Sequence, residues 1–333
     1  MKEKLNTDLR RVTLRQLRIF AAAAEAGTVS GAAQKLNVTP PAVSLQLRQL
    51  EDAAGLPLLE RSDIGLQPTD GGREILDSTR RIEAALAECQ EALEALSGVD
   101  AGHVSVGVIS TAKYFAPRAL AAFARIHPRV EIRLLVGNRK ETIEALKGYD
   151  LDFAVMGRPP EAFEVEKAVI GEHPHIIVGP PGHPLGKRRQ LSIADFAEET
   201  FLLREPGSGT RLLMQRLFSK ARFTPRIGME IGSNETIKQA VMAGLGIALL
   251  SAHTVSAELR DGRLIAFRVQ GLPVLRKWFV VRLSSKRLLP AARALWDFMA
   301  SEGADFLPDL PAAKGRTTGK AKPRTKGRKA RSA

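Results

Sequence analysis

Cysteine is nearly absent from this sequence, which holds Cys89 alone among 333 residues. A single thiol excludes an internal disulfide, and it excludes thiolate-rich zinc and iron–sulfur sites, because these need several sulfur ligands. Histidine is also scarce, and of six histidines only His173 and His175 lie close together in the chain. A pair spaced by proline is more typical of the start of a strand than of a metal site. We therefore expect no metal centre.

Long apolar runs are missing as well. No stretch approaches the roughly 18 to 20 apolar residues of a membrane-spanning helix, and the first residues lack the apolar core of a signal peptide. Nucleotide motifs are incomplete: Leu212 stands where a dinucleotide fingerprint starting at Gly207 needs its third glycine, and Arg188 replaces the Ser or Thr of a phosphate-binding loop. We expect a cytoplasmic protein that makes no membrane contact and is not an enzyme.

Acidic residues are outnumbered by basic ones. The 50 Lys and Arg against 36 Asp and Glu give a net charge of +14 and a pI of about 10.2, which favours a polyanionic partner such as nucleic acid. Within residues 311–333, nine basic residues follow from Lys314 onward with no acid, which leaves +5 of the +14 for the rest. Nothing there can form a core, so we predict a disordered basic tail that either solubilises the chain or attracts DNA phosphates.

Residues 13–71 have the pattern of a winged helix-turn-helix. Apolar residues at three-and-four spacing predict a helix over residues 14–26, and Thr28 or Ser30 can cap a second, short helix. Thr39 offers a capping hydroxyl for a third helix that has Pro40 in its first turn. Residues 56–69 suit a wing, from which Arg61 can contact phosphate. The third helix is expected to bury one face and to present Pro41, Ser44, Leu45 and Arg48 on the other.

Residues 72–98 predict a long linker helix. Its apolar positions recur in steps of four and three, which is a heptad seam typical of helices that pair with a second copy. The alternative is an ordinary amphipathic helix that lies on its own protein. Because Cys89 lies on the seam, we expect it to pack rather than to react. The seam consists of Ile75, Thr79, Ile82, Leu86, Cys89, Leu93 and Leu96.

Residues 99–310 alternate strand-like and helical runs. Strands are predicted over residues 103–110, 130–137, 151–157, 175–179, 201–204, 226–232, 247–251 and 277–283. Helices are predicted over residues 117–127, 140–147, 210–222, 235–243 and 290–301. Repeated strand–helix units predict parallel sheets covered by helices, and about 200 residues suffice for two α/β lobes with a ligand cleft between them.

Three helix starts in this region bring hydroxyl groups and backbone amides together after a strand. They lie near residues 110–113, 204–211 and 232–236, and such starts favour anions because free N–H groups and the helix dipole point outward there. At any one of them the hydroxyls are equally well explained as helix caps. The residues predicted to bind an effector in the cleft are Ser110, Thr111, Lys113, Asn138, Arg139, Arg158, Arg204, Ser208, Thr210, Arg211 and Asn234.

Several motifs together resemble LysR-type transcriptional regulators: Leu14-Arg-Gln-Leu-Arg-Ile-Phe20, Thr39-Pro-Pro-Ala-Val-Ser44, Gln49-Leu-Glu51 and Gly55-Leu-Pro-Leu58. The segments Ser110–Pro117, Met156–Pro160 and Arg204–Arg211 are similar to regulators of Calvin-cycle (RuBisCO) operons. Leu45 stands where many members have a basic residue, and the basic tail is not part of the family pattern.

The resemblance implies a winged helix-turn-helix, a dimerising linker helix and a two-lobed effector domain like that of periplasmic binding proteins. It implies a homodimer or homotetramer that binds an inverted repeat in double-stranded DNA, recruits RNA polymerase and activates carbon-fixation genes. The implied effectors are phosphorylated or nucleotide metabolites such as ribulose bisphosphate, NADPH or phosphoenolpyruvate.

We expect base contacts from the third helix and phosphate contacts from the residues around it. The DNA-binding residues are Thr28, Ser30, Thr39, Pro40, Pro41, Ser44, Gln46, Arg48 and Arg61. Three rival hypotheses remain open. The first is a cytoplasmic small-molecule binding protein or enzyme whose first helices only dimerise it. The second is a regulator of a different metabolic operon, and the third is an architectural DNA-binding protein whose basic tail binds DNA.

Overall fold

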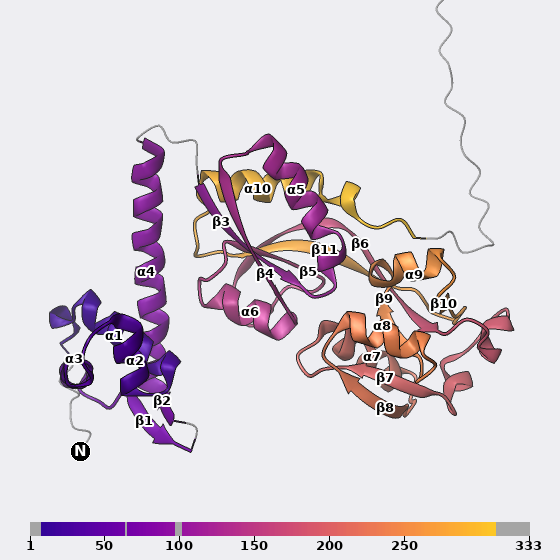
Figure 1. Ribbon diagram of the computed structural model, residues 1–333, viewed down its shortest axis with the longest axis horizontal. Helices are drawn as coiled ribbons and strands as arrows, with labels where there is room; N and C mark the ends of the chain where they lie inside the picture. Colours follow the sequence, from indigo (N-terminus) through magenta and orange to yellow (C-terminus); the bar gives the residue numbers. More distant parts are fainter. Residues whose placement is uncertain (1–7, 64, 97–101, 311–333) are drawn as a thin grey trace, which may run out of the picture.

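The computed structural model describes residues 8–63, 65–96 and 102–310 (Figure 1). The predicted tail at residues 311–333 and the end of the linker at residues 97–98 lie outside this description. Within the described residues, no helix combines the length and the apolar character that crossing a membrane requires. The same residues contain no cluster of three His, Cys, Asp or Glu side chains arranged to hold a metal ion.

The N-terminal domain begins with three helices, α1 (Leu14–Ala26), α2 (Val29–Leu36) and α3 (Pro40–Ala54), preceded by the short turn η1 (Leu9–Arg11). The hydroxyl of Thr28 accepts the Gly31 N–H and caps α2 at 3.0 Å, as the sequence predicts. Each helix ends at a residue with a left-handed backbone. These local signals form the helix-turn-helix, whose core buries Phe20, Ala32, Val43, Leu50 and Leu58.

A two-stranded antiparallel wing follows α3. Its strands are β1 (Leu59–Ser62) and β2 (Gly65–Pro68). The Glu51 carboxylate on α3 accepts the backbone N–H groups of Leu58 at 2.8 Å and Leu59 at 3.3 Å, which fixes the wing to the helix. At the other strand, Leu66 N–H donates to the Gly27 carbonyl. Gly65 has a φ of +110°, and a Cβ there would lie 2.6 Å from that carbonyl oxygen, so only glycine fits.

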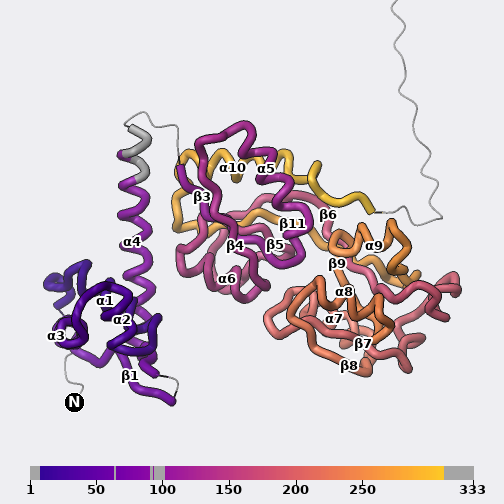
Figure 2. The backbone as a smooth tube through the Cα atoms, in the orientation of Figure 1, coloured from indigo at the N-terminus to yellow at the C-terminus, as the bar shows by residue number. Residues whose placement is uncertain are grey.

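Helix α4 (Asp70–Leu96) has 27 residues and is therefore about 40 Å long (Figure 2). Its first turns pack on the helix-turn-helix core, and Glu83 pairs with Arg18 of α1 at 2.7 Å. Farther along, the predicted seam is uncovered in this single chain: Ile82, Leu86 and Leu93 are 42%, 43% and 62% exposed. Cys89 is exposed as well, so its expected packing depends on a partner helix.

The first lobe of the C-terminal domain surrounds a mixed sheet. Strands β3 (Gly102–Ile109), β4 (Val130–Gly137) and β5 (Phe153–Met156) are parallel, with β3 in the middle. Helices α5 (Ala116–Ile126) and α10 (Pro290–Ser301) lie on one face, where Phe123 and Phe298 meet edge to face, and α6 (Arg139–Lys147) lies on the other (Figure 1). Helix α6 also meets the linker helix, because Lys147 lies 3.6 Å from Asp77.

Two long strands connect the lobes, β6 (Val165–Gly179) and β11 (Val274–Leu283), and they run antiparallel to each other. The prediction of parallel sheets therefore holds for β3, β4 and β5 but not for β6 and β11, and β6 begins ten residues earlier than predicted. Charged residues at positions 166 and 167 hide the strand pattern, because the first half of β6 lies at the edge of the sheet and pairs with β11 alone.

The second lobe contains β7 (Thr200–Arg204) and β8 (Arg226–Ile231), which are parallel, and β9 (Ala248–Ser251) and β10 (Ile265–Ala266), which pair antiparallel with β6. Its helices are α7 (Gly209–Lys220), α8 (Asn234–Met242) and α9 (Ser256–Arg260). The short 3-10 turns of the domain are η2 (Ala112–Tyr114), η3 (Pro184–Lys187), η4 (Ile193–Phe196), η5 (Ala252–Val255) and η6 (Gly303–Phe306). Each lobe has its own apolar core.

Candidate DNA-binding surface and inter-lobe pocket

Helix α3 presents the face that the sequence predicts. Val43, Leu47 and Leu50 are buried against the domain core, whereas Pro41 and Arg48 are exposed on the opposite side. Leu45 is also on this outward side and is 52% exposed. The structure thus separates an inward apolar face from an outward face that can enter a DNA groove.

The other predicted DNA contacts surround this face. Thr39 precedes α3, and its hydroxyl does not make the capping bond that the sequence predicts. The hydroxyl is therefore available to bind a phosphate. Thr28, Ser30, Thr39, Pro40 and Arg61 are exposed, while Ser44 and Gln46 are half-buried. Among the residues that the structure describes, neither Arg48 nor Arg61 has an ion-pair partner.

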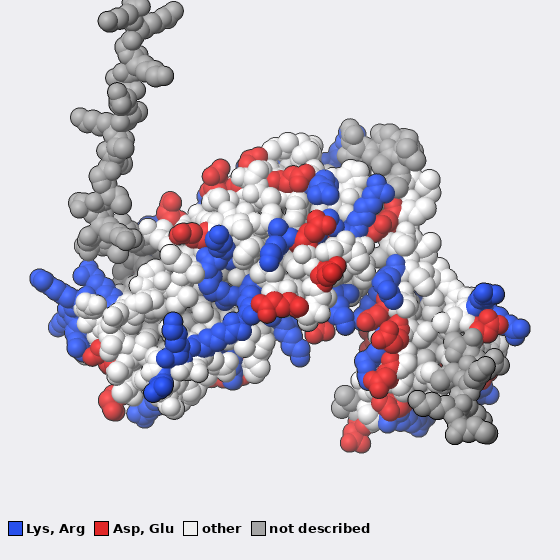
Figure 3. All heavy atoms as spheres, turned by 180° about the vertical axis from the view of Figure 1, so that it is seen from behind, with Lys and Arg blue, Asp and Glu red and all other residues white. Residues whose placement is uncertain are grey.

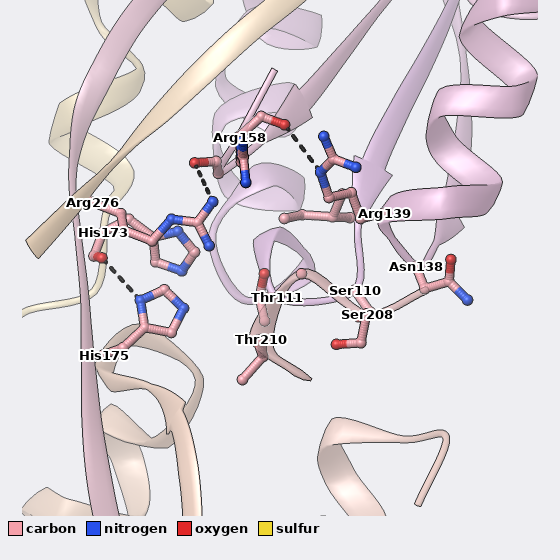
Figure 4. Close-up of a pocket in the computed structure, with 13 residues that line it drawn as sticks. Ser110, Thr111, Asn138, Arg139, Arg158, His173, His175, Ser208, Thr210 and Arg276 are labelled. Atoms are coloured by element: carbon pink, nitrogen blue, oxygen red, sulfur yellow. Dashed lines mark hydrogen bonds between the residues drawn. The ribbon is translucent and has the colours of Figure 1, made fainter. Parts of the chain in front are cut away.

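A polar pocket lies between the two lobes of the C-terminal domain (Figure 4). Its cavity is about 20 Å³, which is room for one water molecule, so the lobes are closed on each other. On its outer side it opens into a groove of about 370 Å³ that shares Arg139, Arg158 and Arg276 and adds Arg216 of α7. The residues around the inner pocket are Ile109, Ser110, Thr111, Asn138, Arg139, Gly157, Arg158, His173, His175, Ser208, Gly209, Thr210 and Arg276.

The hydroxyl groups of the pocket come from the ends of strands and the starts of helices. Ser110 and Thr111 follow β3, and Asn138 follows the parallel neighbour β4, so both strands deliver their carboxyl ends to the pocket. Ser208 precedes α7 and makes no side-chain cap bond, whereas the Asn138 amide oxygen accepts the Glu141 N–H at 3.0 Å. The Ser208 hydroxyl is therefore better placed than the Asn138 side chain to bind a ligand.

Positive charge accumulates along one side of the pocket. Arg139 donates to the carbonyls of Arg158 and Pro159 at 3.3 Å, and Arg276 donates to the Gly157 carbonyl at 3.2 Å. Burial, followed by the repulsion of the neighbouring arginines, lowers the pKa of Arg276 to about 10 and also lowers the pKa of Arg139. Arg158 forms an ion pair with the Glu161 carboxylate, which is mostly exposed. An anion would relieve this repulsion.

Basic side chains also gather along the boundary between the lobes on the face drawn in Figure 3, whereas the long helix carries both signs mixed together. Three arginines line the pocket. Arg139 and Arg276 donate hydrogen bonds to backbone carbonyls, and Arg158 forms an ion pair with one exposed carboxylate. The charge of the boundary is thus largely uncompensated by acidic partners from the described residues.

Two histidines on β6 complete the wall opposite the hydroxyl groups. The ring of His173 stacks on Trp278 at 3.6 Å, and both of its ring nitrogens lack a hydrogen-bond partner among the described residues. His175 Nδ1 lies 3.1 Å from the His173 carbonyl, and His253 Nδ1 accepts the Trp278 N–H at 3.1 Å. Burial lowers the pKa of His173 well below its usual value, that of His175 to about 3 and that of His253 to about 4.

These histidines are neutral at pH 7 and offer hydrogen bonds rather than charge. The sequence favours a strand entry over a metal site for His173 and His175, but it does not assign them to the pocket. The signal was available, because residues 173 and 175 are two apart on a strand and therefore face the same side. Arg276 was missed because the predicted strand started one residue later, at Lys277.

Four residues predicted to bind the effector do not line the pocket. Arg204 is 2% exposed, and its guanidinium donates to Glu205, to Asn234 and to the Ser110 hydroxyl at 3.2 Å, so local acceptors saturate it. Arg211 donates to the Arg204 carbonyl at 3.0 Å and to Glu230. Lys113 lies over the Tyr114 ring at 5.3 Å. In this structure Arg204, Arg211, Asn234 and Lys113 therefore lie outside the pocket lining, and their predicted ligand contacts stay predictions.

Arg204 and Asn234 have another effect. Both belong to the second lobe and both donate to Ser110 of the first, at 3.2 and 3.3 Å, which joins the lobes behind the pocket. A backbone bond from Lys140 N–H to the Gly207 carbonyl, at 3.3 Å, adds a second link. The remaining predicted residues, Ser110, Thr111, Asn138, Arg139, Arg158, Ser208 and Thr210, do meet at the pocket.

A winged helix-turn-helix joined by a long helix to a two-lobed ligand-binding domain defines a one-component transcription regulator. Residues 14–73 match the bacterial regulatory helix-turn-helix protein model of the lysR family, and residues 97–304 match the LysR substrate binding domain. The chain belongs to the LysR family of DNA-binding transcriptional regulators, as its motifs predict. Its relatives are regulators, which confirms the expectation that it is not an enzyme.

The relatives also support the predicted subgroup. The chain is 54% identical to the HTH-type transcriptional regulator CbbR of Xanthobacter flavus over 305 residues, covering 91% of this chain and 92% of that protein. It is 44% identical to the RuBisCO operon transcriptional regulator of Allochromatium vinosum over 293 residues, covering 88% and 97%.

Solved structures show the same architecture. The regulatory domain of Synechocystis PCC6803 CcmR in complex with 2-PG is 33% identical, with a TM-score of 0.58 over 60% of this chain and 96% of that chain. Full-length CbnR with its target DNA is 24% identical, with a TM-score of 0.61 over 86% and 99%, and that likeness concerns the fold alone.

Proposed function

We propose that this protein activates carbon-fixation genes by binding an inverted repeat in double-stranded DNA, and that a phosphorylated metabolite in the inter-lobe pocket controls it. Relatives from Allochromatium vinosum and Acidithiobacillus ferrooxidans are RuBisCO operon transcriptional regulators, which supports the target. The observation that carries the effector proposal is the row of arginines at the pocket, which are partly buried and opposed by one exposed carboxylate. Arginine forks and hydroxyls together suit phosphate oxygens.

The ligand class follows from this geometry. Thr111, Ser208 and Thr210 would donate to one phosphate in the inner pocket, while Arg139, Arg158 and Arg276 supply charge from the outer side. Neutral His173 adds a donor and an acceptor that are unused in this structure. Ribulose bisphosphate, NADPH and phosphoenolpyruvate all carry such a group, and the solved CcmR domain that resembles this one holds 2-PG. The inner cavity alone is smaller than a phosphate, so the ligand either extends into the outer groove or parts the lobes.

Calorimetry on the full chain tests the effector proposal. We expect ribulose bisphosphate to bind and its unphosphorylated parent sugar not to bind. Arg276→Gln should weaken binding at least tenfold without changing DNA affinity in the absence of ligand, whereas Arg293→Gln on the exposed face of α10 should behave as wild type. Equal binding of the sugar and the bisphosphate would contradict the anion site. If none of the three metabolites binds, this effector class is wrong.

We also propose that the chain acts as a homodimer or homotetramer that contacts RNA polymerase. The exposed seam residues Ile82, Leu86 and Leu93 support a paired linker helix, because a stripe of this kind is stable only when covered. Edge strand β8 exposes Ile227 and Met229 in the same way, at 46% and 50%. Light scattering should give a multiple of the 36.2 kDa chain mass, and Leu86→Glu should lower it. A monomeric wild-type protein would contradict this assembly.

A further inference from the structure

A further cavity, beside the end of β6, is separate from the inter-lobe pocket. It is a groove of about 670 Å³ on the second lobe, formed by the end of β6, by β10 and by the chain that leads into β11. We call it the hinge groove. Its apolar wall includes Ile176, Leu264, Phe267 and Leu272, and Leu310 contributes from the end of the described chain. The size and the apolar lining are those of pockets that hold small organic molecules.

The hinge groove and the inter-lobe pocket lie on opposite faces of the same strand. Side chains alternate along β6, so His173 and His175 face the pocket while Pro174 and Ile176 line the groove. No residue is shared between the two linings. A ligand of the groove therefore occupies a site of its own and does not extend the effector site.

Charge selects the kind of ligand. The groove has two arginines, Arg189 and Arg268, together with Gln190 and Gln270, and its lining contains no acidic residue. Arg189 is exposed and, within the described part of the chain, has no partner. The basic sequence that follows Leu310 is a poor occupant, because it carries the same sign as these arginines. An apolar body with one anionic end matches both the apolar wall and the Arg189 side chain.

We propose that the hinge groove is a second small-molecule site, which binds a carboxylate with an apolar body, such as an acyl chain or a fused aromatic ring. The apolar body packs on Phe267 and Leu272, and the anionic end pairs with Arg189. The interaction is hydrophobic burial combined with one charge-assisted contact. It differs from the inter-lobe pocket, whose hydroxyls and arginines suit a small phosphorylated compound.

The test uses the fluorescent anion 1-anilinonaphthalene-8-sulfonate, a fused-ring probe with one negative charge, and the full-length chain. One saturable site per chain is expected, from which decanoate displaces the probe. Ala266→Trp, which fills the groove from an exposed position, and Arg189→Glu should each weaken binding at least tenfold. The matched controls are Ala197→Trp and Arg293→Glu, which substitute exposed residues outside the groove and should bind as wild type.

Three results would overturn the proposal. The first is the absence of saturable probe binding by the wild type, and the second is wild-type affinity in both groove variants. The third combines two observations: the wild type binds no probe, and Ala266→Trp has a lower molecular mass than the wild type. This combination would mean that a second copy of the chain covers the groove. Arg276→Gln should leave probe affinity unchanged, because the inter-lobe pocket is a different site.

Discussion

Acidification should destabilise the lobe that contains Trp278, because three neutral histidines are buried around that ring. In the unfolded chain a histidine has a pKa of about 6.5, whereas burial lowers the pKa of His175 to about 3 and that of His253 to about 4. Between these values the unfolded state binds more protons than the folded state. The free energy of unfolding is therefore highest above pH 6.5, and it decreases as the pH falls toward the pKa values of the histidines in the folded state.

The magnitude follows from linkage. At pH 5, which is 1.5 units below the unfolded pKa and above both folded values, each histidine removes about 2 kcal/mol from the free energy of unfolding. His173 acts in the same direction, since its pKa is also lowered. Losses of this size are a large part of the roughly 5 to 15 kcal/mol that stabilises a domain.

Urea unfolding followed by tryptophan fluorescence measures the effect, because both tryptophans of the chain, Trp278 and Trp296, lie in the core of the first lobe. His175→Asn keeps a hydrogen-bonding group near the position of Nδ1 but cannot titrate. Between pH 7.5 and pH 5 this variant should lose about 2 kcal/mol less than wild type at equal protein concentration. His103→Asn, at an exposed position, controls for the loss of a histidine. Identical losses in wild type and in His175→Asn would refute the reasoning.

The remaining predictions concern the DNA-binding domain. Arg48→Ala should lower affinity for the specific operator by about tenfold or more, as expected for a lost base contact, while affinity for scrambled DNA falls less; fluorescence anisotropy measures both. Glu51→Ala removes the acceptor of two wing N–H groups and should destabilise the domain by about 1 to 3 kcal/mol in thermal denaturation. Gly65→Ala places a Cβ against the Gly27 carbonyl and should cost a similar amount, about 1 to 3 kcal/mol.

Each of these has a clear contrary result. Equal loss of specific and scrambled binding in Arg48→Ala would make it a phosphate contact instead of a base contact. An unchanged melting temperature in Glu51→Ala would mean that the wing does not depend on this carboxylate. A Gly65→Ala protein as stable as wild type would show that the wing shifts without cost.

The N-terminal domain was predictable because its signals are local. Thr28 caps α2, Pro40 fits the first turn of α3, and Gly55 ends that helix. Each of these depends on neighbours within a few residues. Thr39 is the exception, since its hydroxyl makes no capping bond to the helix start that it precedes.

The effector domain was less predictable because its pairing is between distant segments. Nothing local in residues 165–170, where Glu166 and Lys167 interrupt the apolar residues, indicates that this stretch pairs with β11, more than a hundred residues later. In the pocket, hydroxyls at strand ends were found by a topological rule, but the direction of an arginine side chain is set by tertiary packing. Arg204 is turned to Glu205 and Asn234, whereas Arg276, which sequence reasoning missed, reaches the pocket.

The central claim is sequence-specific regulation of a carbon-fixation operon, and one measurement tests it most directly. It is the fluorescence anisotropy of a chain ending at Ala313 on the intergenic DNA upstream of the organism's RuBisCO operon, against scrambled DNA at fixed salt. Removing the basic tail separates specific recognition from general attraction to phosphates. We predict a preference of roughly a thousandfold or more for the operator. Equal binding to the two DNAs would contradict the account.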